Sequence, residues 1–224
     1  MKTTFGIAVI TLTLFAGLVG RGEAITLGLP DISFDSSQGN GQDLFTTQGV
    51  HYDASTGNLA VSAAALAITF DGVNSTALTN GTVDYRVDLL SASSSGGVVT
   101  GLFGTDGVAG ADLVVADSSG VLLTGDFLTY TLNGVIGTNL GTGEAVFIVT
   151  GGSLASFYSG NNGGMVNLTF NVAPAFSSVT FAKNFDGEVK GDVAPVPEPA
   201  SLLLLGSGLI GLGVWGRKKF AGAI

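Results

Sequence analysis

Hydrophobic and polar residues alternate along most of the chain between residues 25 and 192. In TVDYRVDLL (82–90) every second residue is apolar and the residues between are mainly charged. MVNLTFNVA (165–173) repeats the pattern with amides and a threonine on the polar side. A period of two is typical of antiparallel strands with one buried face. The pattern therefore predicts an all-β body.

Clusters of Gly, Asn, Asp and Ser separate the apolar segments and predict tight turns, because these residues tolerate turn conformations. Examples are STGN (55–58), DSSG (117–120) and TGD (124–126). Two segments, ADLVVADS (111–118) and EAVFIVTGG (144–152), are continuously apolar at their centres. Such runs are typical of strands covered on both faces, and we expect that here.

The segment VSAAALA (61–67) is the best candidate for a short helix, and no stretch of ten residues has a strong helical period. The pattern indicates about eight or more strands with frequent turns, which favours an antiparallel β-sandwich of jelly-roll type. We assign this body to residues 25–192. Residues 193–196, within GDVAPV, are expected to form a linker.

The first 24 residues have the organisation of a signal peptide. Lys2 supplies a positive charge, residues 5–19 are mainly apolar, and Gly22 and Ala24 are the small residues that a signal peptidase accepts. We expect cleavage between Ala24 and Ile25. An uncleaved N-terminal anchor is the alternative, and the small residues at the cleavage site argue against it.

Residues 200–216 form an uncharged apolar run, followed directly by Arg217, Lys218 and Lys219. As a helix this run would extend about 26 Å, near the lower limit for crossing a bilayer. The three bases would keep that end in the cytoplasm. We therefore expect a transmembrane helix over 200–216 rather than the alternative, a buried core helix.

Pro197-Glu198-Pro199, the Leu-rich run and the basic cluster together resemble the PEP-CTERM sorting signal of Gram-negative bacteria. The resemblance covers residues 197–220, about a tenth of the chain. It implies recognition by an exosortase, removal of the helix, and release or transfer to the cell surface. It also implies an association with exopolysaccharide production. A signal peptide at the other end agrees with an exported body.

Charge and cysteine content exclude several functions. Fifteen of the 17 acids but only three of the eight bases lie in residues 25–196, so the body is strongly acidic. Nucleic-acid binding is disfavoured because neutralising phosphates requires Lys and Arg. The chain has no cysteine, which excludes disulfides, thiolate metal sites and a cysteine nucleophile.

The candidate catalytic groups do not form a recognisable set. His51 is the only histidine, and on a strand it would share a face with Asp53. The simplest interpretation of His51 is a half-exposed strand residue. Asp84 and Asp88 would lie about 13 Å apart along one strand, too far for a glycosidase pair. We interpret both as solvated charges and predict no catalytic residue.

Calcium binding is the remaining ion-binding possibility, since Ca²⁺ takes carboxylate and carbonyl oxygens from loops. The acidic residues form two sets: Asp106, Asp112 and Asp117, and Asp186, Glu188 and Asp192. Neither set matches a known calcium loop, and both are interpreted as ordinary acidic turns. TGGSLASF (150–157) lacks the features of a phosphate-binding loop and is expected to be a loop or bulge. No metal or cofactor is predicted.

These observations favour a non-enzymatic protein that is exported and resides at the cell surface or in the extracellular matrix. Its expected partners are signal peptidase, exosortase, the membrane before processing, and polysaccharide, with no nucleic acid. The alternative is a secreted carbohydrate-binding module, with or without Ca²⁺. That alternative predicts a platform of exposed aromatic residues, for which the candidates are Tyr52, Tyr85, Tyr130 and Tyr158. A secreted hydrolase is the least supported, because no catalytic set can be named.

Overall fold

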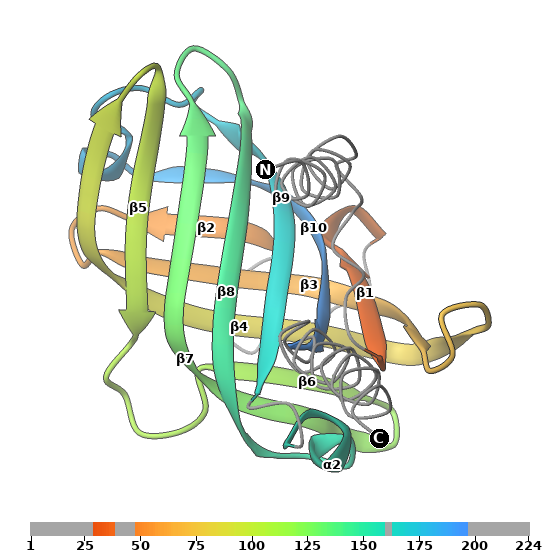
Figure 1. Cartoon of the computed structure of the whole chain (residues 1–224). Helices are drawn as coiled ribbons and strands as arrows, with labels where there is room; N and C mark the ends of the chain where they lie inside the picture. Colours follow the sequence, from red (N-terminus) through yellow and green to blue (C-terminus); the bar gives the residue numbers. More distant parts are fainter. Residues whose placement is uncertain (1–28, 39–47, 160–162, 197–224) are drawn as a thin grey trace, which may run out of the picture.

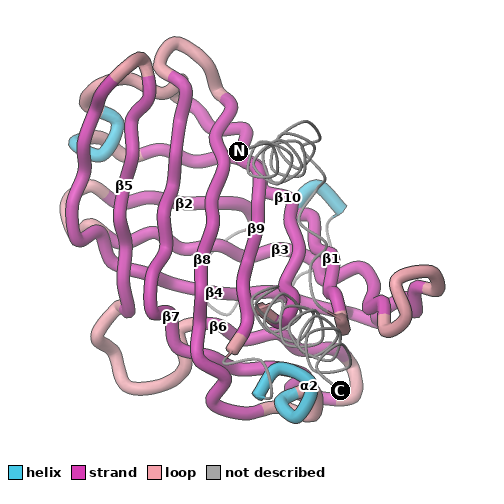
Figure 2. The backbone as a smooth tube through the Cα atoms, in the orientation of Figure 1, coloured by secondary structure: helices cyan, strands magenta, loops and turns pink. Residues whose placement is uncertain are grey.

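A computed structural model describes residues 29–38, 48–159 and 163–196 of the 224-residue chain. Strands account for most of these residues, and the helices are short (Figure 2). The elements in chain order are β1 (Asp31–Asp35), η1 (Ser36–Gln38), β2 (Gly49–Asp53), β3 (Asn58–Thr69), β4 (Ser75–Ser95), β5 (Val98–Thr105), β6 (Leu113–Asp117), β7 (Gly120–Val135), β8 (Leu140–Gly151), α2 (Ala155–Ser159), β9 (Gly164–Ala173), η2 (Thr180–Ala182) and β10 (Phe185–Pro195).

The predicted signal peptide (1–24) and the predicted membrane helix (200–216) lie outside the described residues. Within the described ranges, no helix has the length and apolar character needed to cross a bilayer.

All ten strands of the described chain belong to one antiparallel sheet, in the order β1-β3-β2-β10-β9-β8-β7-β5-β4-β6. Further pairings β1–β10, β3–β4 and β7–β6 give each end strand of that order a second neighbour. An unpaired edge would expose backbone N–H and C=O groups to other chains. The predicted all-β antiparallel class is confirmed, but a single continuous sheet takes the place of the two separate sheets expected of a sandwich.

Two long strands, β4 and β7, carry the sheet from one layer to the other. Along one of its edges, β4 changes partner: residues 82–85 pair with β6, and residues 87–95 pair with β5. The register shifts between Leu89 and Ser91 in β4 and between Phe127 and Thr129 in β7. Such bulges bend a strand and increase its twist. In Figure 1, β5, β7, β8 and β9 accordingly lie across β2, β3 and β4.

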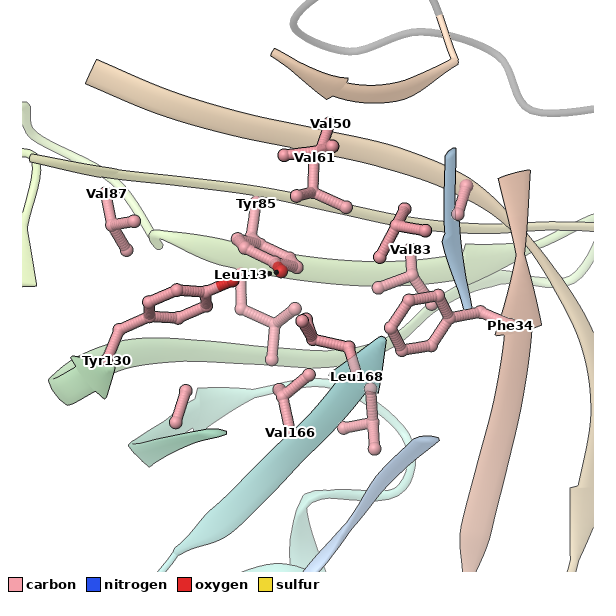
Figure 3. Packing of buried hydrophobic residues seen from close by; sticks show 14 of the residues in the cluster. Phe34, Val50, Val61, Val83, Tyr85, Val87, Leu113, Tyr130, Val166 and Leu168 are labelled. Atoms are coloured by element: carbon pink, nitrogen blue, oxygen red, sulfur yellow. Dashed lines mark hydrogen bonds between the residues drawn. The ribbon is translucent and has the colours of Figure 1, made fainter. Parts of the chain in front are cut away.

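The core fills the space between these layers (Figure 3). Val61 on β3 and Tyr85 on β4 point toward Tyr130 on β7 and Leu168 on β9. All four side chains are buried, and the hydroxyl groups of Tyr85 and Tyr130 lie 3.1 Å apart. The alternation predicted for 82–90 and 165–173 therefore corresponds to an inward-facing row on β4 and another on β9.

Two predictions from local pattern are wrong. VSAAALA, the candidate for a short helix, lies within strand β3. Residues on both faces of this strand are buried, so small alanines fit there, and tertiary packing rather than helix propensity determines the secondary structure. Residues 144–151 of the second run belong to β8, whose inward-facing side chains are buried while several on its other face are exposed, so the strand is not covered on both faces. Ile148 in this strand is exposed.

The last strand contradicts the predicted linker. The composition predicts a linker over residues 193–196, but β10 extends to Pro195 and pairs with β9 from Asp186 to Pro195. Val193 and Ala194 are completely buried. Gly191 does not provide flexibility here, since a Cβ at this position would lie 2.2 Å from the carbonyl oxygen of Asn167. The glycine permits close approach of two strands, and the folded body ends only at the sorting tail.

Candidate functional site

The outer face of β2, β3 and β4 forms the floor of an open polar groove of about 660 Å³, which we call the His51 groove. One wall comes from the segment between β5 and β6, and another from the start of β10. The lining residues are His51, Tyr52, Asp53, Thr56, Asn58, Ala60, Arg86, Asp88, Asp106, Val108, Asn184 and Asp186.

Strand register brings His51 into this groove beside a distant carboxylate. His51 on β2 is paired with Asp186 on β10 on one side and with Ala60 on β3 on the other. Its Nδ1 lies 2.6 Å from Oδ1 of Asp186. Ala60 is in turn paired with Arg86 on β4, so His51, Ala60 and Arg86 lie side by side across three strands.

A second row of polar groups lies one step along the same strands. Asp53, Asn58 and Asp88 are paired in register across β2, β3 and β4. Asn58 Nδ2 donates to Asp88 Oδ1 at 3.0 Å. Asp53 Oδ1 accepts from the backbone N–H and the hydroxyl of Ser55, and these hydrogen bonds lower the pKa of Asp53. This carboxyl is therefore ionised at neutral pH and serves as an acceptor.

A buried carboxylate, Asp112, holds the wall between β5 and β6 in place. Its Oδ1 accepts from the hydroxyl of Thr105 and the N–H of Asp106, and its Oδ2 accepts from the N–H of Phe127 at 2.8 Å. Burial raises the pKa of Asp112, although these hydrogen bonds favour the ionised form. The wall is thus fixed by a side chain that lies beneath the groove and does not line it.

The groove carries four carboxylates, from Asp53, Asp88, Asp106 and Asp186, against the single guanidinium of Arg86. This excess of negative charge disfavours polyanionic ligands. Most of the lining groups are donors and acceptors suited to hydroxyl-rich molecules. The groove can therefore bind neutral polar ligands through hydrogen bonds.

The structure separates the two acidic sets considered for calcium. Asp106 and Asp117 each accept hydrogen bonds from backbone N–H groups two residues further along the chain, at 2.8 Å in both cases. Asp186, Glu188 and Asp192 are spread along strand β10 rather than gathered in a loop. In the described part of the chain, no group of three or more acidic or histidine side chains is placed to hold a metal ion.

Sequence reasoning placed some groups correctly and others wrongly. His51 is a partly exposed strand residue, as predicted, and Asp53 lies on its side of the strand and lines the same groove. Asp84 is not a solvated charge: it is completely buried, and Ser62 Oγ donates to its Oδ1 at 2.6 Å. Asp186 has no local signal that connects it to His51, because 135 residues separate them and only the sheet register joins them.

The aromatic platform expected for a carbohydrate-binding module is not formed by the tyrosines. Tyr52, Tyr85, Tyr130 and Tyr158 are all buried, with at most 3% of their surface exposed. Tyr52 Oη donates to the carbonyl of Phe181, and Tyr158 Oη to the carbonyls of Pro30 and Val193. These hydrogen bonds explain the burial, since each hydroxyl finds a partner inside the fold.

The remaining predicted sites lie outside the described residues. They are the cleavage site at Ala24 and Ile25, the motif Pro197, Glu198 and Pro199, and the basic cluster Arg217, Lys218 and Lys219. The structure contributes the position of the residues that precede the motif, because β10 ends at Pro195 and Val196 follows with its N–H donating to the carbonyl of Gly163.

Comparison with curated proteins and with solved structures gives no match for this chain. Comparison with protein families does give one, because residues 195–218 match the PEP-CTERM protein-sorting motif. The match includes the Pro-Glu-Pro triplet, the apolar run and the first two bases after it. The chain therefore carries a PEP-CTERM sorting signal, which makes it an exosortase-processed protein that is exported through a membrane-anchored stage.

Proposed function

We propose that this protein is a non-enzymatic component of the cell surface or extracellular matrix, associated with exopolysaccharide. The sorting motif carries the proposal, since it begins at Pro195, the last residue of the last strand. The folded body is thus joined to the sorting signal without an intervening linker. This arrangement suits a protein whose body is the cargo and whose tail is an address.

The chemistry of the His51 groove supports a binding role over a catalytic one. A glycosidase acid must hold its proton at working pH, whereas hydrogen bonds from Ser55 keep Asp53 ionised. Asn58 and Asp88 are engaged with each other, and His51 is engaged with Asp186. Fixed donors and acceptors of this kind position a ligand through hydrogen bonds.

Polysaccharide is the ligand class that this groove favours. This holds whether the protein is a matrix component or, as the alternative, a carbohydrate-binding module. Since the tyrosines are buried, contact with sugars would rest on hydrogen bonds that Asn58 and Arg86 donate and that the carboxylates accept. A groove with this charge favours neutral over acidic glycans.

The sorting part of the proposal is tested by cell fractionation. Replacing Pro197, Glu198 and Pro199 by alanine is expected to retain the protein in the inner membrane at a higher apparent mass. The matched control replaces Ser93, Ser94 and Ser95, three exposed residues at the end of β4, by alanine. Normal release of the motif variant would contradict the proposal.

The binding part is tested separately with the exported protein on an array of neutral and acidic glycans, with and without EDTA. Asn58→Ala is expected to lower affinity for neutral glycans at least tenfold. Asn171→Ala, on the exposed face of β9, is the control and is expected to bind normally. Equal binding by both variants would remove the groove from the proposal, and loss of binding in EDTA would indicate a Ca²⁺-dependent module.

A further inference from the structure

Four exposed apolar side chains gather at the end of the molecule that carries α2, and we call them the apolar rim: Leu29, Phe70, Val73 and Phe157. Phe70 and Phe157 expose 48% and 49% of their surface, and Val73 exposes 83%. The two phenylalanine rings are in edge contact, with centroids 5.6 Å apart. Leu29 Cδ1 lies 3.8 Å from the position that a Cβ on Gly72 would occupy, so it adjoins the turn between β3 and β4. Contiguous exposed apolar groups of this kind mark contact surfaces.

The chain leaves the folded body at this same end. The N–H of Val196 donates to the carbonyl of Gly163, and the N–H of Gly163 donates to the carbonyl of Tyr158 in α2. Phe157 is the neighbouring residue in that helix. Figure 1 shows α2 at one end of the sheet and the β7–β8 hairpin at the other. The apolar rim is therefore next to the exit point of the sorting tail.

The length of chain beyond Val196 limits how far the rim can be from the membrane. Only residues 197–199 separate Val196 from the uncharged run that begins at residue 200. Four residue steps reach at most about 14 Å when fully extended. In the membrane-anchored stage the exit point therefore lies within about 14 Å of the start of the apolar run. The exposed side chains at the α2 end are then within reach of the bilayer interface, where apolar groups insert about 5–10 Å.

We propose that the apolar rim docks on the lipid bilayer while the tail is anchored, and that it orients the body with α2 toward the membrane. The contact is apolar rather than electrostatic. Of the three basic residues among the described ranges, Lys190 is engaged with Asp35, Arg86 lies in the His51 groove, and Lys183 follows η2. Asp71 is the charge within the rim, and hydrogen bonds from Asn74 and Val73 lower its pKa to about 2. Because Asp71 is ionised, docking is expected to require no anionic lipid, and on neutral phosphatidylcholine it is expected to change little with salt.

The absence of cysteine allows a direct test with the full chain, its tail inserted into phosphatidylcholine vesicles. Val73→Cys places a fluorescent label on the rim, and Leu140→Cys places the same label on an exposed residue, 64% accessible, at the far end of β8. Quenching by doxyl-labelled lipids is compared with quenching by iodide. We expect the label at 73 to be quenched by lipid at least fivefold more than the label at 140, at both low and high salt.

Three results would overturn the proposal. Equal lipid quenching at the two positions would show that the rim does not meet the bilayer. A label at 73 that is shielded from both lipid and iodide would show that a protein, such as a second copy, covers the rim. Release of the chain by carbonate would show that the tail is not anchored in the membrane. That result would contradict the membrane-anchored stage itself, whereas the first two results would contradict only the contact between the rim and lipid.

A paired substitution tests whether the two rings make the contact. Phe70→Ser with Phe157→Ser, combined with Val73→Cys, is expected to lower lipid quenching at position 73 at least threefold. Val135→Ser with Leu140→Ser is the control, because both residues are exposed near the opposite hairpin. Unchanged quenching in a phenylalanine variant that retains the wild-type circular dichroism spectrum would contradict the proposal.

Discussion

Asp31, the first residue of β1, is expected to make the folded protein less stable as pH rises. Its Oδ1 is buried without a hydrogen-bond partner. Asp192 of β10 is paired with Ser33, two residues after Asp31, and therefore lies on the same face of the sheet as Asp31. Burial and, to a smaller extent, the charge of Asp192 raise the pKa of Asp31 from 3.8 to about 6. The folded state therefore holds a proton that the unfolded chain has released, and the free energy of unfolding falls between about pH 4 and pH 6.

The magnitude follows from the difference of about two pKa units. At about 1.4 kcal/mol per unit the penalty at neutral pH would be about 3 kcal/mol, and solvent screening of this half-buried group reduces it to about 1–2 kcal/mol. Asp31→Asn keeps the shape and removes the charge. We expect it to stabilise the protein by about 1–2 kcal/mol at pH 7.5 and by almost nothing at pH 4, where Asp31 is already neutral.

The assay is urea unfolding of the exported protein at pH 4, 5, 6 and 7.5. The other groups facing Asp31 are Asp192, whose own pKa is raised by burial, and Tyr158, which stays neutral over this range. Asp35→Asn is a control of opposite sign on the same strand. Burial acts to raise the pKa of Asp35, but hydrogen bonds from Lys190 and Ser37 outweigh it and lower this pKa, so removing that charge should destabilise the protein at pH 7.5. A stability gain for Asp31→Asn that is equal at pH 4 and pH 7.5 would refute the reasoning.

Four further substitutions test the packing by urea unfolding. Tyr85→Phe or Tyr130→Phe alone should cost about 1–3 kcal/mol, because the remaining buried hydroxyl loses its partner, while the double variant should be within about 1 kcal/mol of wild type; additive single effects would contradict this. Gly134→Ala should cost about 1–3 kcal/mol, since its Cβ would lie 2.3 Å from the ring of Phe176, and an unchanged midpoint would argue against that contact. Asp112→Ala should cost at least about 2 kcal/mol and expose residues 106–111 to limited proteolysis, with a resistant loop as the contrary result.

The sequence predicted those parts of the fold that depend on nearest neighbours along a strand. Alternation over 82–90 identified Val83, Tyr85 and Val87 as inward-facing, because successive strand residues point to opposite faces whatever their neighbours are. The same rule placed His51 and Asp53 on one side of β2. It could not show that Asp84 is buried, because the cover over the second face of a sheet is decided by tertiary packing.

The candidate site was less accessible from sequence for the same reason. The His51 groove requires the pairing of β2 with β10, and nothing near His51 indicates that Asp186 will lie beside it. Composition was also misleading in GDVAPV, where glycine and proline indicate a loop but Gly191 serves a close approach between strands. The sorting signal was predictable because its parts are contiguous in the sequence, so no fold is needed to bring them together.

The position of β10 sets the timing of folding during export. Among the described strands this one is the last to be synthesised, yet β1, β2 and β9 all form hydrogen bonds with it. A chain that crosses the membrane from its N-terminus onward cannot complete its hydrogen-bond network until residue 195 has emerged. By then the apolar run is the segment that occupies the translocation channel. Completion of the body and arrival of the sorting signal at the membrane are therefore expected to coincide.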